Sequence, residues 1–109
     1  MKYLLLDAKG AITEVDGPMD VLDAQEVLDD DFEALQPSMP PPYVMLVAMN
    51  GKRKGMEANW LATRAMKHNM KPDDFIVGPA IVTGPPNAVG ELTDVSDEVL
   101  AAFQERVSR

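Results

Sequence analysis

The sequence predicts an α+β fold, with a small, mostly antiparallel sheet of about five or six strands and about three helices. Three observations predict it. The chain has 109 residues, the length of a single domain, and it shows no internal repeat or linker. Short apolar or alternating runs are bounded by glycine, proline and asparagine turns, as in strands joined by hairpins. Three further segments have the apolar spacing and terminal residues of helices.

The first third of the chain predicts a hairpin, a helix and a short strand. Residues 3–6 and 11–15 read as two strands around a turn that ends in Gly10. Pro18 suits the first turn of a helix that runs to about Leu28. Residues 32–35 read as a third strand. The helix is expected to bury one apolar arc, made of Val21, Leu22, Ala24 and Leu28.

The middle of the chain holds the most apolar strand. Residues 37–42 are rich in proline, which predicts an extended loop. Residues 43–49 are apolar on both faces, which predicts a central strand. Asn50-Gly51 is a strong hairpin turn signal, and it predicts that the cationic segment 52–56 pairs back as a short edge strand.

The last part of the chain predicts two helices around a broken strand. Asn59 is a candidate cap for a helix from Trp60 to about His68. Residues 75–83 form a strand region that is broken or bulged at Gly78-Pro79, and residues 84–90 form a loop. Ser96 is expected to cap the final helix, whose buried stripe is Val99, Leu100, Phe103 and Val107.

The net charge of −8 is unevenly distributed along the chain. Residues 1–35 carry −8, residues 36–72 carry +5 and residues 73–109 carry −5. A basic middle between two acidic ends indicates either internal neutralisation or two opposed charged faces. The absence of cysteine, of a long apolar run and of a signal-peptide core predicts a cytoplasmic protein that does not enter a membrane.

Signatures of catalysis, metal binding and phosphate loops are missing. His68 is the single histidine, and it is expected to be a solvated residue near a helix end. The three serines lie in no nucleophile motif. The acidic run 29–31 lacks the glycine and the distal glutamate of a calcium loop, and Gly78 to Gly84 lacks the lysine of a phosphate loop. We therefore expect no catalytic residue, no metal and no cofactor.

One constellation points to a binding surface. Trp60, Arg64, Lys67 and Lys71 have helical spacing that puts an indole beside three cations on one face. Three further cations, Lys52, Arg53 and Lys54, follow the preceding turn. Such a basic strip with one aromatic residue suits a phosphate-bearing ligand or an acidic protein surface. The alternative is that Trp60 belongs to the core and the cations form an ordinary solvated face.

Methionines are concentrated in the same part of the chain. Six of the eight lie between Met39 and Met70. Methionine fills irregular cores and also adapts to binding partners. Met45, Met49 and Met66 are expected in the core.

From about Tyr43 to Val107 the chain resembles an uncharacterised family of small proteins encoded by tailed bacteriophages and by mobile elements of their hosts. The resemblance lies in the order and spacing of several short pieces rather than in one motif. It implies a small α+β domain made inside an infected or carrying cell, and it brings no activity or catalytic residues. The matching pieces are residues 49–56, Asn59 with Ala62-Thr63, residues 74–84 and residues 90–94.

Three functions follow in order of preference. The first is a non-enzymatic accessory protein that binds a host or phage macromolecule through the basic and aromatic helix face or the acidic N-terminal helix. The second is a binder of a nucleotide or other phosphate ligand, in which Arg64, Lys67 and Lys54 face phosphates and Trp60 stacks on a base. The third is an acidic DNA mimic using Asp20, Asp23, Glu26 and residues 29–31.

The partner expected from this order is a host or phage protein. Direct nucleic-acid binding is disfavoured because the net charge repels a polyanion. A homodimer formed through the short cationic strand is a further alternative. The position of Trp60 separates the first two functions: an open pocket beneath Arg64 favours a small ligand, and a buried indole favours a protein partner.

Overall fold

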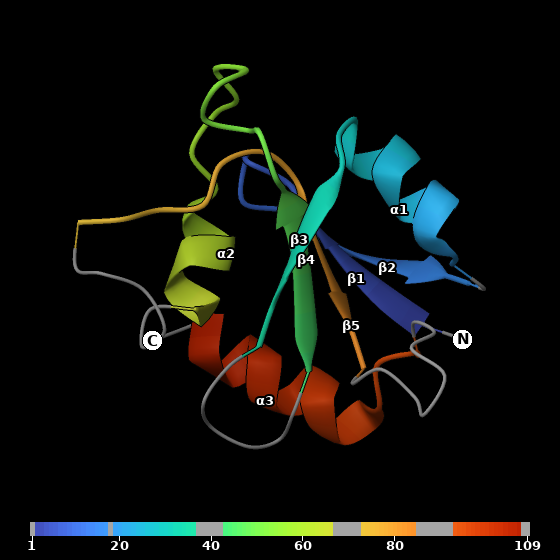
Figure 1. The fold of residues 1–109 in the computed structure, drawn as a ribbon. Coiled ribbons are helices and arrows are strands. Elements are labelled where there is room, and N and C mark those ends of the chain that lie inside the picture. Colours follow the sequence, from blue (N-terminus) through green and yellow to red (C-terminus); the bar gives the residue numbers. More distant parts are fainter. Residues whose placement is uncertain (1, 18, 37–42, 67–72, 85–92, 108–109) are drawn as a thin grey trace.

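A five-stranded antiparallel sheet lies between helices on both of its faces. The computed structural model describes residues 2–17, 19–36, 43–66, 73–84 and 93–107. The strand order is β2-β1-β5-β4-β3. Helix α1 covers one face, and α2 and α3 cover the other (Figure 1). The expected α+β class, the five strands and the three helices are confirmed.

The N-terminal hairpin is formed as the alternating pattern predicts. Strand β1 (Lys2–Leu6) pairs with β2 (Ile12–Asp16), and Tyr3 lies opposite Val15. The Asp7 carboxylate closes the turn because it accepts hydrogen bonds from the N–H groups of Lys9 and Ala11, both at 2.9 Å.

The middle of the sheet is β5 (Ala80–Thr83), which pairs with β1 on one side and β4 on the other. Strand β4 (Val44–Ala48) is buried along its whole length, as its apolar sequence predicts, and it lies between β5 and the edge strand β3 (Phe32–Leu35). The expected break before β5 is also present. Gly78 has φ +75°, and a Cβ there would lie 2.6 Å from the Met56 sulfur.

The prediction that residues 52–56 form an edge strand is wrong. Residues 49–55 form successive turns, in which the N–H groups of Lys54 and Met56 bond to the carbonyls of Asn50 and Gly51. Asn50 does not start a hairpin because Asp30 binds both its backbone N–H and its side-chain amide. The chain instead makes a single bridge between Ala58 and Val77.

Helix α1 (Val21–Leu28) begins three residues after the predicted start. Asp20 is its N-cap, and Asp20 and Asp23 accept hydrogen bonds from each other's backbone N–H. Asp29 ends the helix in the left-handed conformation, at φ +54°. Ala24 and Leu28 are buried as expected, but Leu22 is 71% exposed. The reason is geometric: Leu22 and Ala24 are two positions apart in the sequence, which is about 200° around the helix, so they lie on opposite faces.

Helix α2 (Trp60–Ala65) is shorter than predicted, and its predicted cap is confirmed. The Asn59 carboxamide oxygen accepts from the Ala62 N–H at 3.0 Å. Its amide nitrogen donates to the carbonyls of Leu6 (3.0 Å) and Gly78 (2.9 Å). One buried side chain therefore joins α2 to the end of β1 and to the bend before β5.

Helix α3 (Asp97–Val107) is capped by Ser96, as predicted. Its Val99 and Phe103 are buried, and Phe103 meets the Tyr43 ring edge-on with ring centroids 5.8 Å apart. Successive side chains of the strands point to opposite faces of the sheet. They therefore contribute to two cores, one beneath α2 and α3 and one beneath α1.

Several predictions lie outside the described residues. These are the proline-rich loop 37–42, the C-terminal end of the predicted helix at His68, and most of the loop 84–90. Gly84 itself is described, and it makes a bridge with Thr93.

Candidate functional site

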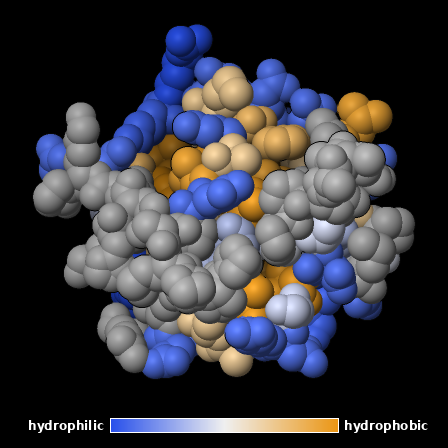
Figure 2. Space-filling view, turned by 60° about the horizontal axis from the view of Figure 1, so that its bottom comes forward, coloured by the Kyte–Doolittle hydropathy of each residue, from blue (hydrophilic) through white to orange (hydrophobic). Residues whose placement is uncertain are grey.

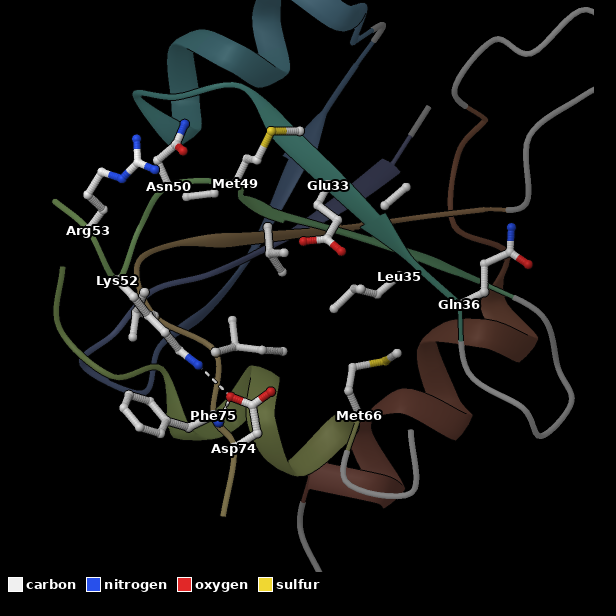
Figure 3. Close-up of a pocket in the computed structure, with 15 residues that line it drawn as sticks. Glu33, Leu35, Gln36, Met49, Asn50, Lys52, Arg53, Met66, Asp74 and Phe75 are labelled. Carbon is white, nitrogen blue, oxygen red and sulfur yellow. Dashed lines mark hydrogen bonds and ion pairs between the residues drawn. The ribbon is translucent and has the colours of Figure 1, made fainter. Parts of the chain in front are cut away.

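A pocket of about 830 Å³ lies beside the edge strand β3, on the face of the sheet that carries α2 and α3 (Figure 3). Its walls come from β3, from β4 and the turns after it, from Met66 at the end of α2, and from residues 74–77. Glu33 and Leu35 extend into it from β3 (Figure 3). The pocket therefore combines an apolar floor with charged groups at its margin.

Strand periodicity explains which β3 side chains reach the pocket. Successive residues of a strand point to opposite faces. Phe32 packs on the core beneath α1, whereas Leu35 packs on the core beneath α2 and α3. Glu33 shares the face of Leu35, so an acidic group is held beside apolar surface at an exposed edge.

The turns after β4 are held against α1 by Asp30. Its carboxylate accepts hydrogen bonds from the backbone N–H of Asn50 (2.6 Å) and from the Asn50 side chain (3.1 Å). These bonds, chiefly the one from the Asn50 backbone, together with the N–H of Asp31 and the nearby Lys54 ammonium at 3.6 Å, outweigh desolvation and lower the pKa of Asp30 from its ordinary value. Lys54 also donates to the carbonyl of Asp29 at 2.6 Å.

An aromatic pair lies next to the pocket. Trp60, the first residue of α2, is 59% exposed, and its ring centroid lies 5.6 Å from that of Phe75. The ammonium of Lys52 lies 4.8 Å from the centre of the Phe75 ring and forms an ion pair with Asp74. Phe75, Lys52 and Asp74 line the pocket, whereas Trp60 lies outside it.

The structure brings only part of the predicted site together. Trp60 and Arg64 are one helical turn apart on α2 and both are exposed. Lys52 lies close to Trp60 through the Phe75 ring, which both contact. Arg53 lines the pocket near Asn50 (Figure 3). Lys54 instead faces α1 through Asp29 and Asp30. Lys67 and Lys71 lie outside the described residues, and α2 ends at Ala65, before both of them.

Three residues of the site were not among those predicted. Phe75 appeared only as part of a strand, and Glu33 only as an acid in an ambiguous short strand. Met49 was expected in the core but is 55% exposed and lines the pocket. The bend at Gly78-Pro79 was the available signal for Phe75, because it separates residues 74–77 from β5 and leaves them beside α2.

Most aspartates of the surface proposed as a DNA mimic cap helix α1, end it or make hydrogen bonds near it. Asp20 and Asp23 cap α1, Asp29 ends it and Asp30 holds Asn50. On the face shown in Figure 2, hydrophobic residues interspersed with hydrophilic ones are visible in the upper part, and further hydrophobic residues are visible below. Four large apolar side chains are exposed among the described residues, namely Leu22, Val27, Met49 and Trp60.

The fold and the pocket define a small α+β domain, in which β2 and β3 are the edge strands of the described sheet. The chain belongs to the family described as "Domain of unknown function (DUF3846)", whose model matches residues 1–108. The match therefore extends beyond the segment from about Tyr43 to Val107 on which the resemblance rested, and includes the N-terminal part of the chain. Comparisons with curated proteins and with solved structures gave no significant match. No helix in the described part of the chain has the length and hydropathy needed to cross a bilayer.

Proposed function

We propose that this protein is a non-enzymatic accessory protein that binds a host or phage protein in the cell that carries it. The contact is made by the aromatic–basic surface, defined as Trp60, Arg64, Phe75, Lys52 and Arg53. Trp60 meets neither of the two conditions set from the sequence, because it is 59% exposed and does not line the pocket. The observation that carries the proposal is this exposed indole outside the pocket, packed at a tilt against Phe75.

The chemistry of this surface suits a protein partner. Tryptophan and arginine are enriched among the residues that dominate the binding energy of protein interfaces. The Phe75 ring supports the indole on one side, so little conformational entropy remains to be lost when a partner covers it. The Lys52 ammonium over the same ring, paired with Asp74, places polar groups next to the apolar contact.

A nucleotide is the less favoured ligand because the groups expected to hold it are apart. Trp60 does not line the pocket. Lys52 is paired with Asp74, and Lys54 with Asp30 on the side of α1. A phosphate that binds Lys52 competes with the Asp74 carboxylate, and one that binds Lys54 competes with the Asp30 carboxylate.

The test compares capture of proteins from a host-cell lysate by the wild-type chain and by two variants. Trp60→Ala removes the exposed indole, and Leu22→Ala removes another exposed apolar side chain, from α1 on the other face of the sheet. We expect a discrete partner whose affinity falls at least tenfold with Trp60→Ala and stays unchanged with Leu22→Ala.

Two results contradict the proposal. One is an identical set of captured proteins for all three chains. The other is stabilisation by a nucleotide in a thermal-shift screen, about 2.7 kcal/mol at one hundred times its Kd, that Trp60→Ala abolishes. The second result establishes the nucleotide function in its place.

A further inference from the structure

The outer edge of β3 has backbone groups that pair with no other strand among the described residues, and it lies directly beside the pocket. Met49 donates its N–H to the carbonyl of Asp31 at 2.9 Å, and the register places Glu33 opposite Val47. Hydrogen-bonded pairs alternate along an antiparallel ladder, so Asp31, Glu33 and Leu35 direct their backbone groups toward β4. Phe32 and Ala34 therefore direct their N–H and C=O groups outward, away from the sheet.

We infer that an extended segment of the protein partner binds here as a sixth strand, antiparallel to β3. The inference rests on the proposed function and adds the mode of binding and the chemistry of the bound segment. Backbone hydrogen bonds to Phe32 and Ala34 supply the pairing, and alternate side chains of the segment enter the pocket.

The pocket specifies two positions of that segment. Residues opposite Glu33 and Leu35 lie in non-hydrogen-bonded pairs, where facing side chains are closest. Glu33 is exposed and makes no ion pair with any described residue, so a basic side chain fits opposite it. Leu35, with Val47 and Met66 behind it, suits an apolar side chain. Read from its N-terminus, the bound segment carries an apolar residue and, two positions later, a lysine or arginine.

The same geometry disfavours a second copy of this chain as the occupant. The two-fold register that pairs the outward groups of Phe32 with those of Ala34 places Glu33 directly opposite its own counterpart. The register that pairs Phe32 with itself places Glu33 opposite Asp31, and the one that pairs Ala34 with itself places it opposite Leu35, so none of the three gives Glu33 a basic partner. Like charges that face each other across two strands destabilise the pair. The net charge of −8 likewise favours a basic peptide over another acidic chain.

The test begins with selection of binders from a library of random nine-residue peptides displayed on an inert carrier. We expect enrichment of the apolar, any, basic pattern. The most enriched peptide is then titrated into the 15N-labelled wild-type chain, and its Kd is obtained from the shifts of the Phe32 and Ala34 amides.

Two variants examine the edge and the charge separately. Ala34→Pro removes an outward N–H, a change that an edge strand tolerates, and we expect at least tenfold weaker binding. Glu14→Pro is its matched control, because the register of β2 directs the Glu14 N–H outward at the opposite edge, and binding stays unchanged. Glu33→Lys weakens binding at least tenfold, and exchanging the basic residue of the peptide for glutamate restores it.

The inference is overturned if no peptide is enriched, if the enriched peptides lack the basic residue, or if Ala34→Pro binds as the wild type does. A natural partner that is lost with Trp60→Ala but retained with Ala34→Pro leaves the proposed function intact and refutes strand addition. A partner that neither substitution affects refutes both.

Discussion

Asn59 is fully buried and makes more use of its side chain than a helix cap requires. A cap needs only the acceptor oxygen, which bonds to the Ala62 N–H. The amide nitrogen satisfies two carbonyls from other parts of the chain, those of Leu6 and Gly78. The Asn59 side chain therefore fixes the start of α2, and with it the neighbouring residue Trp60, relative to the sheet.

Asn59→Ala is expected to lower the free energy of unfolding by about 3 kcal/mol, because it removes the cap and also the two buried hydrogen bonds to the carbonyls of Leu6 and Gly78. Ser96→Ala removes a cap that is exposed, and its expected cost is about 1 kcal/mol. Urea unfolding of both variants measures the difference. Equal costs for the two substitutions show that the bonds to Leu6 and Gly78 contribute nothing to stability.

Asp30 links the stability of the protein to pH. Hydrogen bonds from Asn50, above all from its backbone, lower the pKa of Asp30 in the folded chain. The stabilisation is therefore complete above the pKa of the unfolded chain, near 4, and is lost as the pH falls through the lower folded value. Asp30→Asn should be less stable than the wild type at neutral pH, and the difference should shrink below about pH 4.

Urea midpoints measured from about pH 7 to pH 2 test this expectation. Lys54→Met is the control, because it removes the nearby ammonium but keeps the hydrogen bonds from Asn50. Its effect on the pH dependence should be the smaller of the two. A difference between wild type and Asp30→Asn that stays constant over this range contradicts the assignment.

At the scale of elements, the sequence predicts those whose local pattern agrees with their packing. The β1–β2 hairpin, the caps Asn59 and Ser96, and the burial of Val99 and Phe103 on α3 are of this kind. Segment 52–56 is different. Asn50-Gly51 favours a hairpin locally, but Asp30, twenty residues away, binds Asn50, and this contact is invisible to a local pattern.

The docking of α3 depends on Phe103, which has no exposed surface and meets Tyr43 edge-on. The Tyr43 hydroxyl donates to the carbonyl of Ala65, so the contact also reaches α2. Phe103→Ala should cost about 3–5 kcal/mol, the usual range for truncating a buried phenylalanine. Leu22→Ala, on the exposed side of α1, should change stability by less than about 0.5 kcal/mol. Thermal unfolding of both variants measures this, and a small effect of Phe103→Ala shows that α3 docks independently of that ring.

For the molecule as a whole, the charge pattern of the sequence indicates the segment that contributes Lys52 and Arg53 to the pocket, but not the other lining residues. The basic middle of the chain does lie beside the pocket, through Lys52 and Arg53. Part of that charge is neutralised internally, since Lys52 pairs with Asp74 and Lys54 with Asp30. The pocket also needs Glu33, from the acidic first third. A site built by strand pairing between β3 and β4 combines segments that linear charge analysis treats separately.

The assembly state of the molecule should follow from one side chain at its edge. Glu33 stands between the outward backbone groups of Phe32 and Ala34, where an inward-pointing charge discourages edge-to-edge pairing. The wild-type chain should therefore be monomeric at micromolar concentration. Glu33→Val removes the repulsion between facing copies and supplies a β-branched side chain, so the variant should dimerise through β3.

Light scattering coupled to size-exclusion chromatography measures this directly. The double variant Glu33→Val with Ala34→Pro should return to a monomer, because proline removes an N–H that the paired edges need. Glu14→Val is the matched control on β2, the other edge of the sheet, and it tests whether any added valine causes association. Dimerisation that persists with Ala34→Pro places the contact elsewhere, and a wild-type dimer shows that Glu33 does not protect this edge.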